Sequence, residues 1–233
     1  MDSWLLRAVG WGVYPAVVLL VLGIGWRLRQ WRRKLPSPVR PGVYPKPTAV
    51  QKVLRVGLDT FFFPQLAEIA PAFWLVVIIF HASLLAVFIG HLHLLGGLPG
   101  ALEGAAGRVA EPAGGTAGVL WALATGCLLG RRLGKRYRSI STAGDYLLLL
   151  LLLGVIVSGC LLRAADLELA ACQEYFSSLL ALRPALPAEL AVSPHRWLLA
   201  SHVLLASLLL TCIPFSKLVH FLLAFITNWL RRS

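Results

Sequence analysis

A long apolar segment that contains two histidines limits the folds open to this sequence more than any other stretch. It covers residues 197–230 and reads WLLASHVLLASLLLTCIPFSKLVHFLLAFITNWL, with His202 and His220 in its interior. The 18-residue spacing equals about five turns of an α-helix, so we predict one membrane-spanning helix with both imidazoles on the same face. Histidines within a membrane span are costly to bury and are typical of functional sites.

Further apolar segments predict four more spans. Runs near 9–26, 70–95, 112–130 and 146–162 each have about the length that crosses a bilayer. With 58% hydrophobic and 14% charged residues, the composition excludes a disordered chain and an ordinary soluble domain. The sequence therefore predicts an all-α membrane protein with five transmembrane helices, which form a single domain over 1–233.

The basic residues are distributed unevenly among the segments that join these spans. Nine of the 22 Lys and Arg residues lie between spans one and two, five lie between spans three and four, and three follow Phe215. The remaining connections together hold five. Because cytoplasmic loops are enriched in Lys and Arg, we expect a multi-pass protein of the cytoplasmic (inner) membrane, with the N-terminus outside and the C-terminus in the cytoplasm. Topology also accounts for the net charge of +12, so the expected surroundings are a lipid bilayer and not nucleic acid.

The basic linker between spans one and two, residues 27–60, has two parts. Its first part is rich in proline, which disfavours a helix. From Ala49 the sequence VQKVLRVGLDTFFF is amphipathic and is typical of a helix in the membrane interface. The linker is either a solvated topogenic loop or a docking surface for a soluble partner on the same side of the membrane.

The second span also contains histidines, and its direction places them in two layers with those of the fifth span. Span two runs from the cytoplasm outwards and span five runs back, so His91 can face His202 near the outside and His81 can face His220 near the cytoplasm. Opposed imidazoles from neighbouring helices are an axial ligand set for b-type haem, which predicts two haems. The spacings of the two spans differ, and a bend at Pro214 is expected to absorb the difference.

Other polar residues near these layers have weaker assignments. Arg131, Arg132 and Lys217 are available to pair with haem propionates at the inner layer, or they only anchor the chain by the positive-inside rule. His93 is expected at the outer surface, and His195 is expected in the loop before span five, without a role.

Two other functional classes make different demands on the sequence. A membrane zinc or copper site needs a tighter cluster or added carboxylates, and the four cysteines form no C-x-x-C pair that would favour iron–sulfur or zinc ligation by this chain. A transporter with a histidine relay predicts acidic residues in the spans and paired broken helices. A structural membrane anchor predicts a colourless protein.

Several sequence blocks occur in an order that resembles the cytochrome b (gamma) subunit of respiratory nitrate reductase. They are Phe80–His81, VFIGH ending at His91, AGGTAGVL at 113–120, RRLGKRYRSISTAGD at 131–145 and SHVLLASLLLTCIPFSKLVH ending at His220. The resemblance implies a five-span dihaem subunit that oxidises quinol. It also implies the same ligand pairs, His91 with His202 and His81 with His220.

The linker and the outer loop depart from that family. The long proline-rich linker is more similar to the related cytochrome b of dissimilatory sulfite-reduction complexes and of heterodisulfide-reductase-linked complexes. That similarity implies a cytoplasmic iron–sulfur partner and further membrane subunits. The family has a lysine near its quinol site, where this chain offers only Arg108, so the expected contacts for menaquinone or ubiquinone are Gly90, His91 and Arg108. No catalytic residue is expected in this chain, and substrate chemistry, if any, is expected in the partner.

Overall fold

The computed structural model describes residues 3–34, 48–92, 94, 100–165, 167, 169–220 and 224. Within these ranges all regular structure is helical, and no strand occurs among them. The long helices are α1 (Ser3–Lys34), α4 (Pro71–Leu92), α5 (Gly100–Leu133), α7 (Ala143–Ala164) and α10 (Arg196–Cys212). The shorter ones are α2 (Ala49–Phe61), α3 (Pro64–Ile69), α6 (Lys135–Arg138), α8 (Leu169–Leu180), α9 (Ala188–Val192), η2 (Ile213–Phe215) and η3 (Lys217–Val219). The all-α prediction is confirmed.

Four helices in the described part of the chain are long and apolar enough to cross a membrane. They cover Arg7–Trp31, Pro71–Leu92, Ala143–Ala164 and Arg196–Phe215. The span predicted at 112–130 lies within α5 and is not among these four, so the count of five spans remains a prediction.

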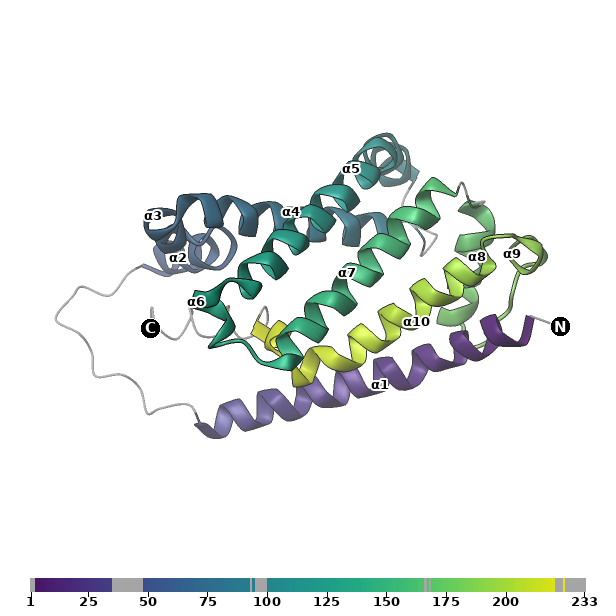
Figure 1. The fold of residues 1–233 in the computed structure, drawn as a ribbon. Coiled ribbons are helices and arrows are strands. Elements are labelled where there is room, and N and C mark those ends of the chain that lie inside the picture. Colours follow the sequence, from purple (N-terminus) through teal and green to yellow (C-terminus); the bar gives the residue numbers. More distant parts are fainter. Residues whose placement is uncertain are drawn as a thin grey trace.

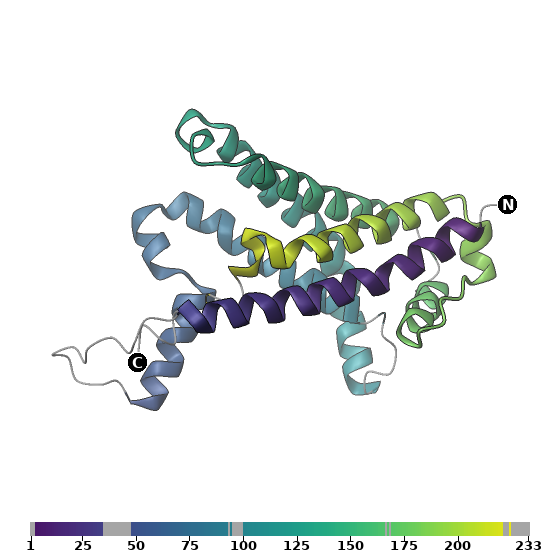
Figure 2. The same cartoon turned by 90° about the horizontal axis from the view of Figure 1, so that it is seen from below.

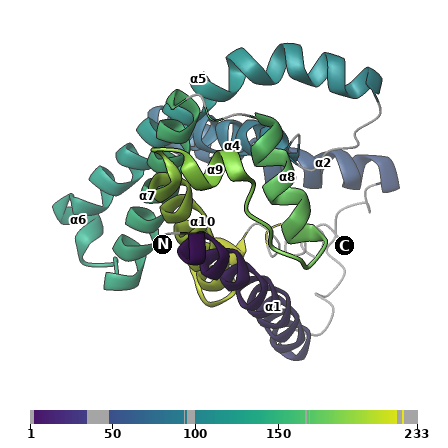
Figure 3. The ribbon, with the colours of Figure 1, turned by 90° about the vertical axis from the view of Figure 1, so that its right-hand side faces the viewer.

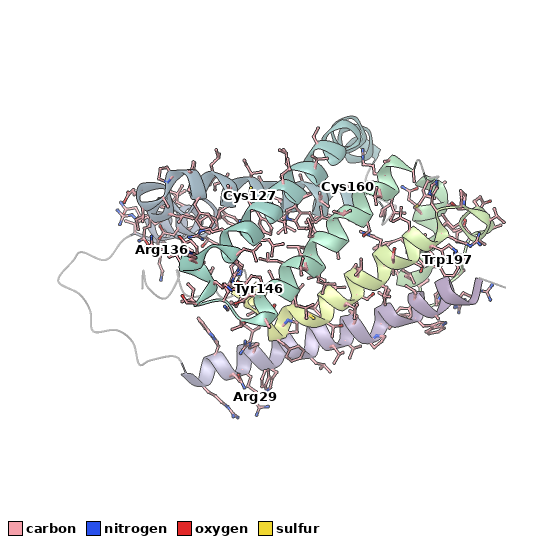
Figure 4. The ribbon with its side chains drawn as sticks, viewed as in Figure 1. Arg29, Cys127, Arg136, Tyr146, Cys160 and Trp197 are labelled. Carbon is pink, nitrogen blue, oxygen red and sulfur yellow. The ribbon has the colours of Figure 1, made fainter. Side chains whose placement is uncertain are left out.

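The long helices form an elongated bundle (Figure 1). Extensive contacts run from α4 to α5, from α5 to α7, from α7 to α10 and from α10 to α1. One end of the bundle, here called the basic end, contains Arg29 of α1 and the basic helix α6, and Trp197 lies at the other end (Figure 4). Helices α8 and α9 lie at the end with Trp197, next to the start of α10 and the N-terminus, and we call it the α8 end (Figure 3).

The apolar side chains are divided between a small interior and a large outer surface. One buried cluster lies between α5, α7 and α4 and contains Phe80, Trp121, Ala124, Leu152 and Ile156. The other, at the α8 end, contains Ala171, Tyr175, Leu179, Leu190, Leu199 and Ala200. Many large apolar side chains on the long helices are nevertheless exposed, among them Leu22, Phe88 and Leu123. Apolar surface of this extent suits helices that face lipid.

The prediction of one continuous helix over 197–230 is wrong. Helix α10 ends at Cys212, and the chain continues through η2 and η3 to His220. Pro214 lacks an N–H group and cannot continue the α-helical hydrogen bonds, while the side chain of Ser216 accepts a bond from the N–H of Leu218 and starts η3. The argument that His202 and His220 share one helical face therefore fails. Residues 221–223 and 225–230 of the predicted span lie outside the described residues.

The connections also differ from the prediction at three places. The linker predicted from residue 27 begins later, because α1 continues to Lys34, and its residues 35–47 lie outside the described part. The amphipathic helix predicted from Ala49 is confirmed, and Thr48 and Gln51 form a capping box at its start. The connection before the span predicted at 112–130 is already helical from Gly100, and the connection before the span predicted from residue 197 contains α8 and α9.

Candidate functional site

The structure brings four histidines together in two pairs. The rings of His81 on α4 and His220 after η3 have centroids 6.4 Å apart and lie nearly perpendicular, at 86°. The rings of His91 on α4 and His202 on α10 have centroids 6.3 Å apart and an interplanar angle of 20°. We call these the basic-end pair and the α8-end pair, respectively. They are the same two combinations that the directions of the spans predicted.

In three of the four histidines the Nδ1 atom bonds a backbone carbonyl. His81 bonds Val77, and His91 bonds Val87, each one turn earlier on α4, at 2.8 Å. His220 bonds the carbonyl of Lys217 at 2.8 Å. A carbonyl oxygen only accepts hydrogen bonds, so Nδ1 carries the hydrogen and Nε2 keeps its lone pair in the neutral ring. Metal-binding histidines have this arrangement, in which the second ring nitrogen fixes the tautomer and the ring orientation.

His202 reaches the same state through a side chain. Its Nδ1 lies 3.0 Å from Oγ of Ser158, which is buried on α7. Oγ of Ser158 also lies 2.8 and 3.0 Å from the carbonyls of Gly154 and Val155, and when its single hydrogen is donated to one of these, Oγ accepts from Nδ1–H of His202. The next residue is Gly159, where an added Cβ would lie 3.1 Å from Cε1 of His202. Helix α7 has no histidine, yet it determines how this one is oriented.

The dimensions of both pairs fit a metal between two imidazoles. Bonds of about 2 Å from a metal to each ring nitrogen place the ring centroids roughly 6 Å apart. Both measured separations, 6.3 and 6.4 Å, have this size. Among the residues that the structure describes, no group of three or more His, Cys, Asp or Glu side chains could hold a metal ion. The pairs therefore suit a cofactor that supplies the other ligands itself, as the porphyrin of a haem does.

Aromatic rings surround His81. The ring of Phe80 lies 5.2 Å from it and also contacts Trp121, at 6.0 Å. The ring of Phe63 lies 5.3 Å from it on another side. Phe63 joins α2 to α3 with φ 48°, in the left-handed region that bulky residues rarely adopt. These contacts make the site around His81 apolar.

An acidic residue that the sequence analysis missed lies at the basic end. Asp145, in the first turn of α7, is buried, and its Oδ2 lies 2.7 Å from Nζ of Lys217 and 3.3 Å from Nη1 of Arg132. The third predicted propionate partner, Arg131, instead stacks on Phe73 at 3.5 Å. Only the spacing T-x-x-D, which forms a capping box at Thr142, marks Asp145 in the sequence. Because Lys217 precedes His220 in the turn, its ion pair ties that turn to α7.

A cavity of about 620 Å³ opens beside this ion pair. It lies between α1, the start of α7 and the turns after α10, and its lining includes Arg27, Trp31, Asp145, Lys217 and His220. Arg27 also donates from Nε to the carbonyl of Pro214 at 3.2 Å. The cavity adjoins the basic-end pair and belongs to the same site.

Two of the three residues predicted to contact quinone, Gly90 and His91, lie on α4 at the α8-end pair. His91 is exposed, and an added Cβ on Gly90 would meet no atom within 4 Å, so the surface there is open. Arg108 is part of α5, but its side chain lies outside the described part, as does His93. His195 is the residue before α10.

Helix α8 contacts α1 at the α8 end of the bundle. The hydroxyl of Tyr14 on α1 donates to the carbonyl of Leu179 at 3.0 Å. Burial, with a smaller effect of Tyr14, raises the pKa of Tyr175 to about 12. Burial also raises the pKa of the Cys172 thiol. The sequence analysis assigned this segment to a loop and predicted none of these contacts.

The chain is similar to known proteins over most of its length. The family model described as nitrate reductase gamma subunit matches residues 66–233. An Hdr-like menaquinol oxidoreductase cytochrome b-like subunit of Archaeoglobus profundus is 34% identical over 157 residues, which is 64% of this chain and 46% of that protein. A subunit of the same description from Archaeoglobus fulgidus is 28% identical over 247 aligned positions, covering 89% of this chain and 74% of that protein. The chain thus spans about half the length of the first relative. Since the family match covers well over half of it, the chain belongs to the nitrate reductase gamma subunit family, a multi-pass membrane cytochrome b family.

Proposed function

We propose that this chain is a dihaem b membrane subunit that passes electrons between the quinone pool and a cytoplasmic iron–sulfur partner. The observation that supports this most is the arrangement of the four histidines. Each has a bonded Nδ1, and the two pairs of rings lie 6.3 and 6.4 Å apart. His91 and His202 would hold one haem iron, and His81 and His220 the other. When bound, haem supplies one-electron transfer at each pair.

The residues around the pairs have three roles in this proposal. Backbone carbonyls and Ser158 orient the imidazoles before the cofactor binds, since each Nδ1 is already fixed. Phe63 and Phe80 exclude water from the side of His81. Lys217 and Arg132 give the basic end a positive charge suited to propionates, while Asp145 holds both cations in position.

Quinol would bind at the α8-end pair. The exposed His91 and the open surface at Gly90 leave room for a molecule that diffuses in from the bilayer, and Arg108 on α5 is the cation proposed to contact it. The names of both relatives state menaquinol, which favours menaquinone over ubiquinone. The two electrons of a quinol would leave singly towards the basic end, and its protons would be released on the outside.

We propose that the protein crosses the cytoplasmic (inner) membrane five times. Its N-terminus lies outside, and its basic end faces the cytoplasm. This orientation is supported by the position of Arg29 and of the basic helix α6 at one end of the bundle, opposite Trp197 (Figure 4). A cytoplasmic iron–sulfur subunit related to heterodisulfide reductase would dock at this end. The relatives are named as subunits of an Hdr-like oxidoreductase, so further membrane subunits are proposed as well.

The experiment that tests this function is reduction of the purified protein by a menaquinol analogue such as menadiol. In the unmodified protein we expect menadiol to produce the absorbance bands of reduced b-type haem. In His91→Ala we expect haem reduction to be absent or much slower. His195→Ala is the matched control, because His195 belongs to neither pair. A histidine-relay transporter or a structural anchor predicts no haem absorbance in any of these proteins. Equal reduction of His91→Ala and the control would contradict the proposed quinol site.

A further inference from the structure

Helix α2 has an apolar face that is largely exposed in the described part of the chain. The six exposed residues on or next to this face are Val50, Val53, Leu54, Leu58, Phe61 and Phe62. Between half and two thirds of each side chain is exposed, from 52% for Leu58 to 67% for Val50. Because a helix turns once in about 3.6 residues, positions 50, 53, 54, 57, 58 and 61 lie within less than half of its circumference. The face is therefore continuous.

The charged residues of α2 lie on its opposite side. Lys52, Arg55 and Asp59 are centred roughly 170° around the helix from Val50, and two of these three are basic. Val56, which is only 1% exposed, lies on the flank between the two faces. The helix thus contacts the protein with its flank, while its apolar face and Arg55 on the opposite face are exposed. A helix that only completes the protein core would instead bury its apolar face.

The direction of α2 fits the same pattern. In Figure 1 the long helices run across the view while α2 is seen along its axis, and in Figure 2 it runs across the direction of α1 and α10. It lies at the basic end, next to α3 and the start of α4. A helix at the end of a membrane bundle, oriented across the spans, lies in the plane of the membrane surface.

We propose that α2 is an interfacial helix whose partner is the phospholipid bilayer. Its apolar face lies among the first carbons of the acyl chains, and its charged face, with Lys52 and Arg55, lies among phosphate headgroups and water. The basic character of the polar face suits anionic phospholipid. The inference depends on the membrane location of the bundle but not on the haem assignment.

The contacts after α2 transmit its position to the first histidine. The indole Nε1 of Trp74 on α4 donates to the carbonyl of Phe62 at 2.7 Å, which ties the end of α2 to the start of the span. The next residue, Phe63, places its ring 5.3 Å from the ring of His81. Lipid that holds α2 at the membrane surface therefore also holds Phe63 against the basic-end pair.

The test uses the full chain in nanodiscs that contain anionic phospholipid. A genetically encoded fluorescent amino acid sensitive to polarity is placed at Val53 in one protein and at Arg55 in the other. Both side chains are exposed, and they point roughly 160° apart, so the two labels differ mainly in the face they report. Nitroxide-labelled phospholipid, with the nitroxide at carbon 5 or carbon 12, is the membrane quencher, and iodide is the aqueous quencher.

We expect the label at position 53 to be quenched several-fold more by lipid nitroxide than by iodide, and more strongly by the nitroxide at carbon 5 than by that at carbon 12. The label at position 55 should be quenched more by iodide than by lipid nitroxide. Iodide quenching at position 53 equal to that at position 55 would mean that the apolar face is in water, and the proposal would be wrong. Protection of position 53 from both quenchers would mean that protein covers the face, which also overturns it. Haem content has no part in this readout, so the outcome is independent of the proposed function.

Discussion

Replacing Ser158 with alanine isolates the one histidine contact in this site that depends on a side chain. Ser158→Ala removes the oxygen that lies 3.0 Å from Nδ1 of His202 and leaves the backbone unchanged. The other three histidines bond backbone carbonyls and keep their partners. The substitution should therefore affect the α8-end pair alone.

The size of the effect follows from burial of the contact. Ser158 is 6% exposed, so its loss removes a buried hydrogen-bond partner of His202, at a cost of about 1–3 kcal/mol. Removing the hydrogen-bond partner of a metal-binding histidine typically lowers metal affinity by about 10–100-fold, which corresponds to about 1.4–2.8 kcal/mol. The two figures are of similar size, although the first is a cost to folding and the second is a loss of metal affinity. The imidazole also becomes less electron-donating without the bond, which should raise the reduction potential of the haem it holds.

The assay is a redox titration of purified Ser158→Ala together with haem quantification. We expect reduced occupancy and a higher potential for one haem, with the other unchanged. Ser201→Ala is the matched control, because Ser201 lies beside His202 on α10 but donates to the carbonyl of Leu198. Ser158→Thr, which keeps the hydroxyl, should retain most of the haem occupancy that Ser158→Ala loses. If folded Ser158→Ala matched the control in both haems, or altered both haems equally, the assignment of Ser158 to His202 would be refuted.

Three further predictions concern the rest of the site. Asp145→Asn should selectively lower retention of the basic-end haem, because it breaks the ion pair with Lys217 that holds the turn before His220. The cost is about 1–3 kcal/mol, since the lysine is exposed. Equal retention of both haems after purification would contradict this prediction. Gly159→Val should displace His202 and lower occupancy of the α8-end haem, whereas Gly126→Ala, where an added Cβ meets no atom within 4 Å, should keep both. Burial raises the pKa of Tyr175 to about 12, against 10 in the unfolded chain, so its contribution to stability is complete below pH 10 and is lost as the pH rises towards 12. Between pH 10 and pH 12 the melting temperature of Tyr175→Phe should therefore fall less than that of the unmodified protein.

The directions of the spans were enough to predict which histidines meet. An antiparallel order of helices fixes which end of each span is near which end of the next, so His81 could only approach His220 and His91 only His202. Ring distances of 6.3 and 6.4 Å agree with that reasoning. The binding of haem iron by these pairs remains the proposal.

The path of the chain to His220 could not be predicted in the same way. Pro214 was recognised as a bend, but whether a helix bends or ends there depends on the competing bonds of Ser216, which caps the next turn. The argument from the 18-residue periodicity therefore rested on a wrong local structure, whereas the directions of the spans predicted the right pairs. Helix α2, by contrast, has a strong amphipathic pattern and a capping box in its own sequence, and it was predicted from Ala49.

The supporting residues were missed because their partners are distant in sequence. Ser158 is one hydroxyl in a leucine-rich span, and its histidine follows 44 residues later. Asp145 is paired with a lysine 72 residues away. Phe63 adopts a left-handed backbone that sequence pattern does not predict for a bulky residue. Such contacts become visible only when the helices are packed together.

The most direct test of the proposed function is a pyridine haemochrome assay on purified, folded protein, with haem b quantified per chain. The two imidazole pairs predict a value of two, falling to one in His220→Ala and to one in His202→Ala. A value near zero in protein whose helical content is intact would contradict the proposal and would leave a histidine-relay transporter or a structural anchor.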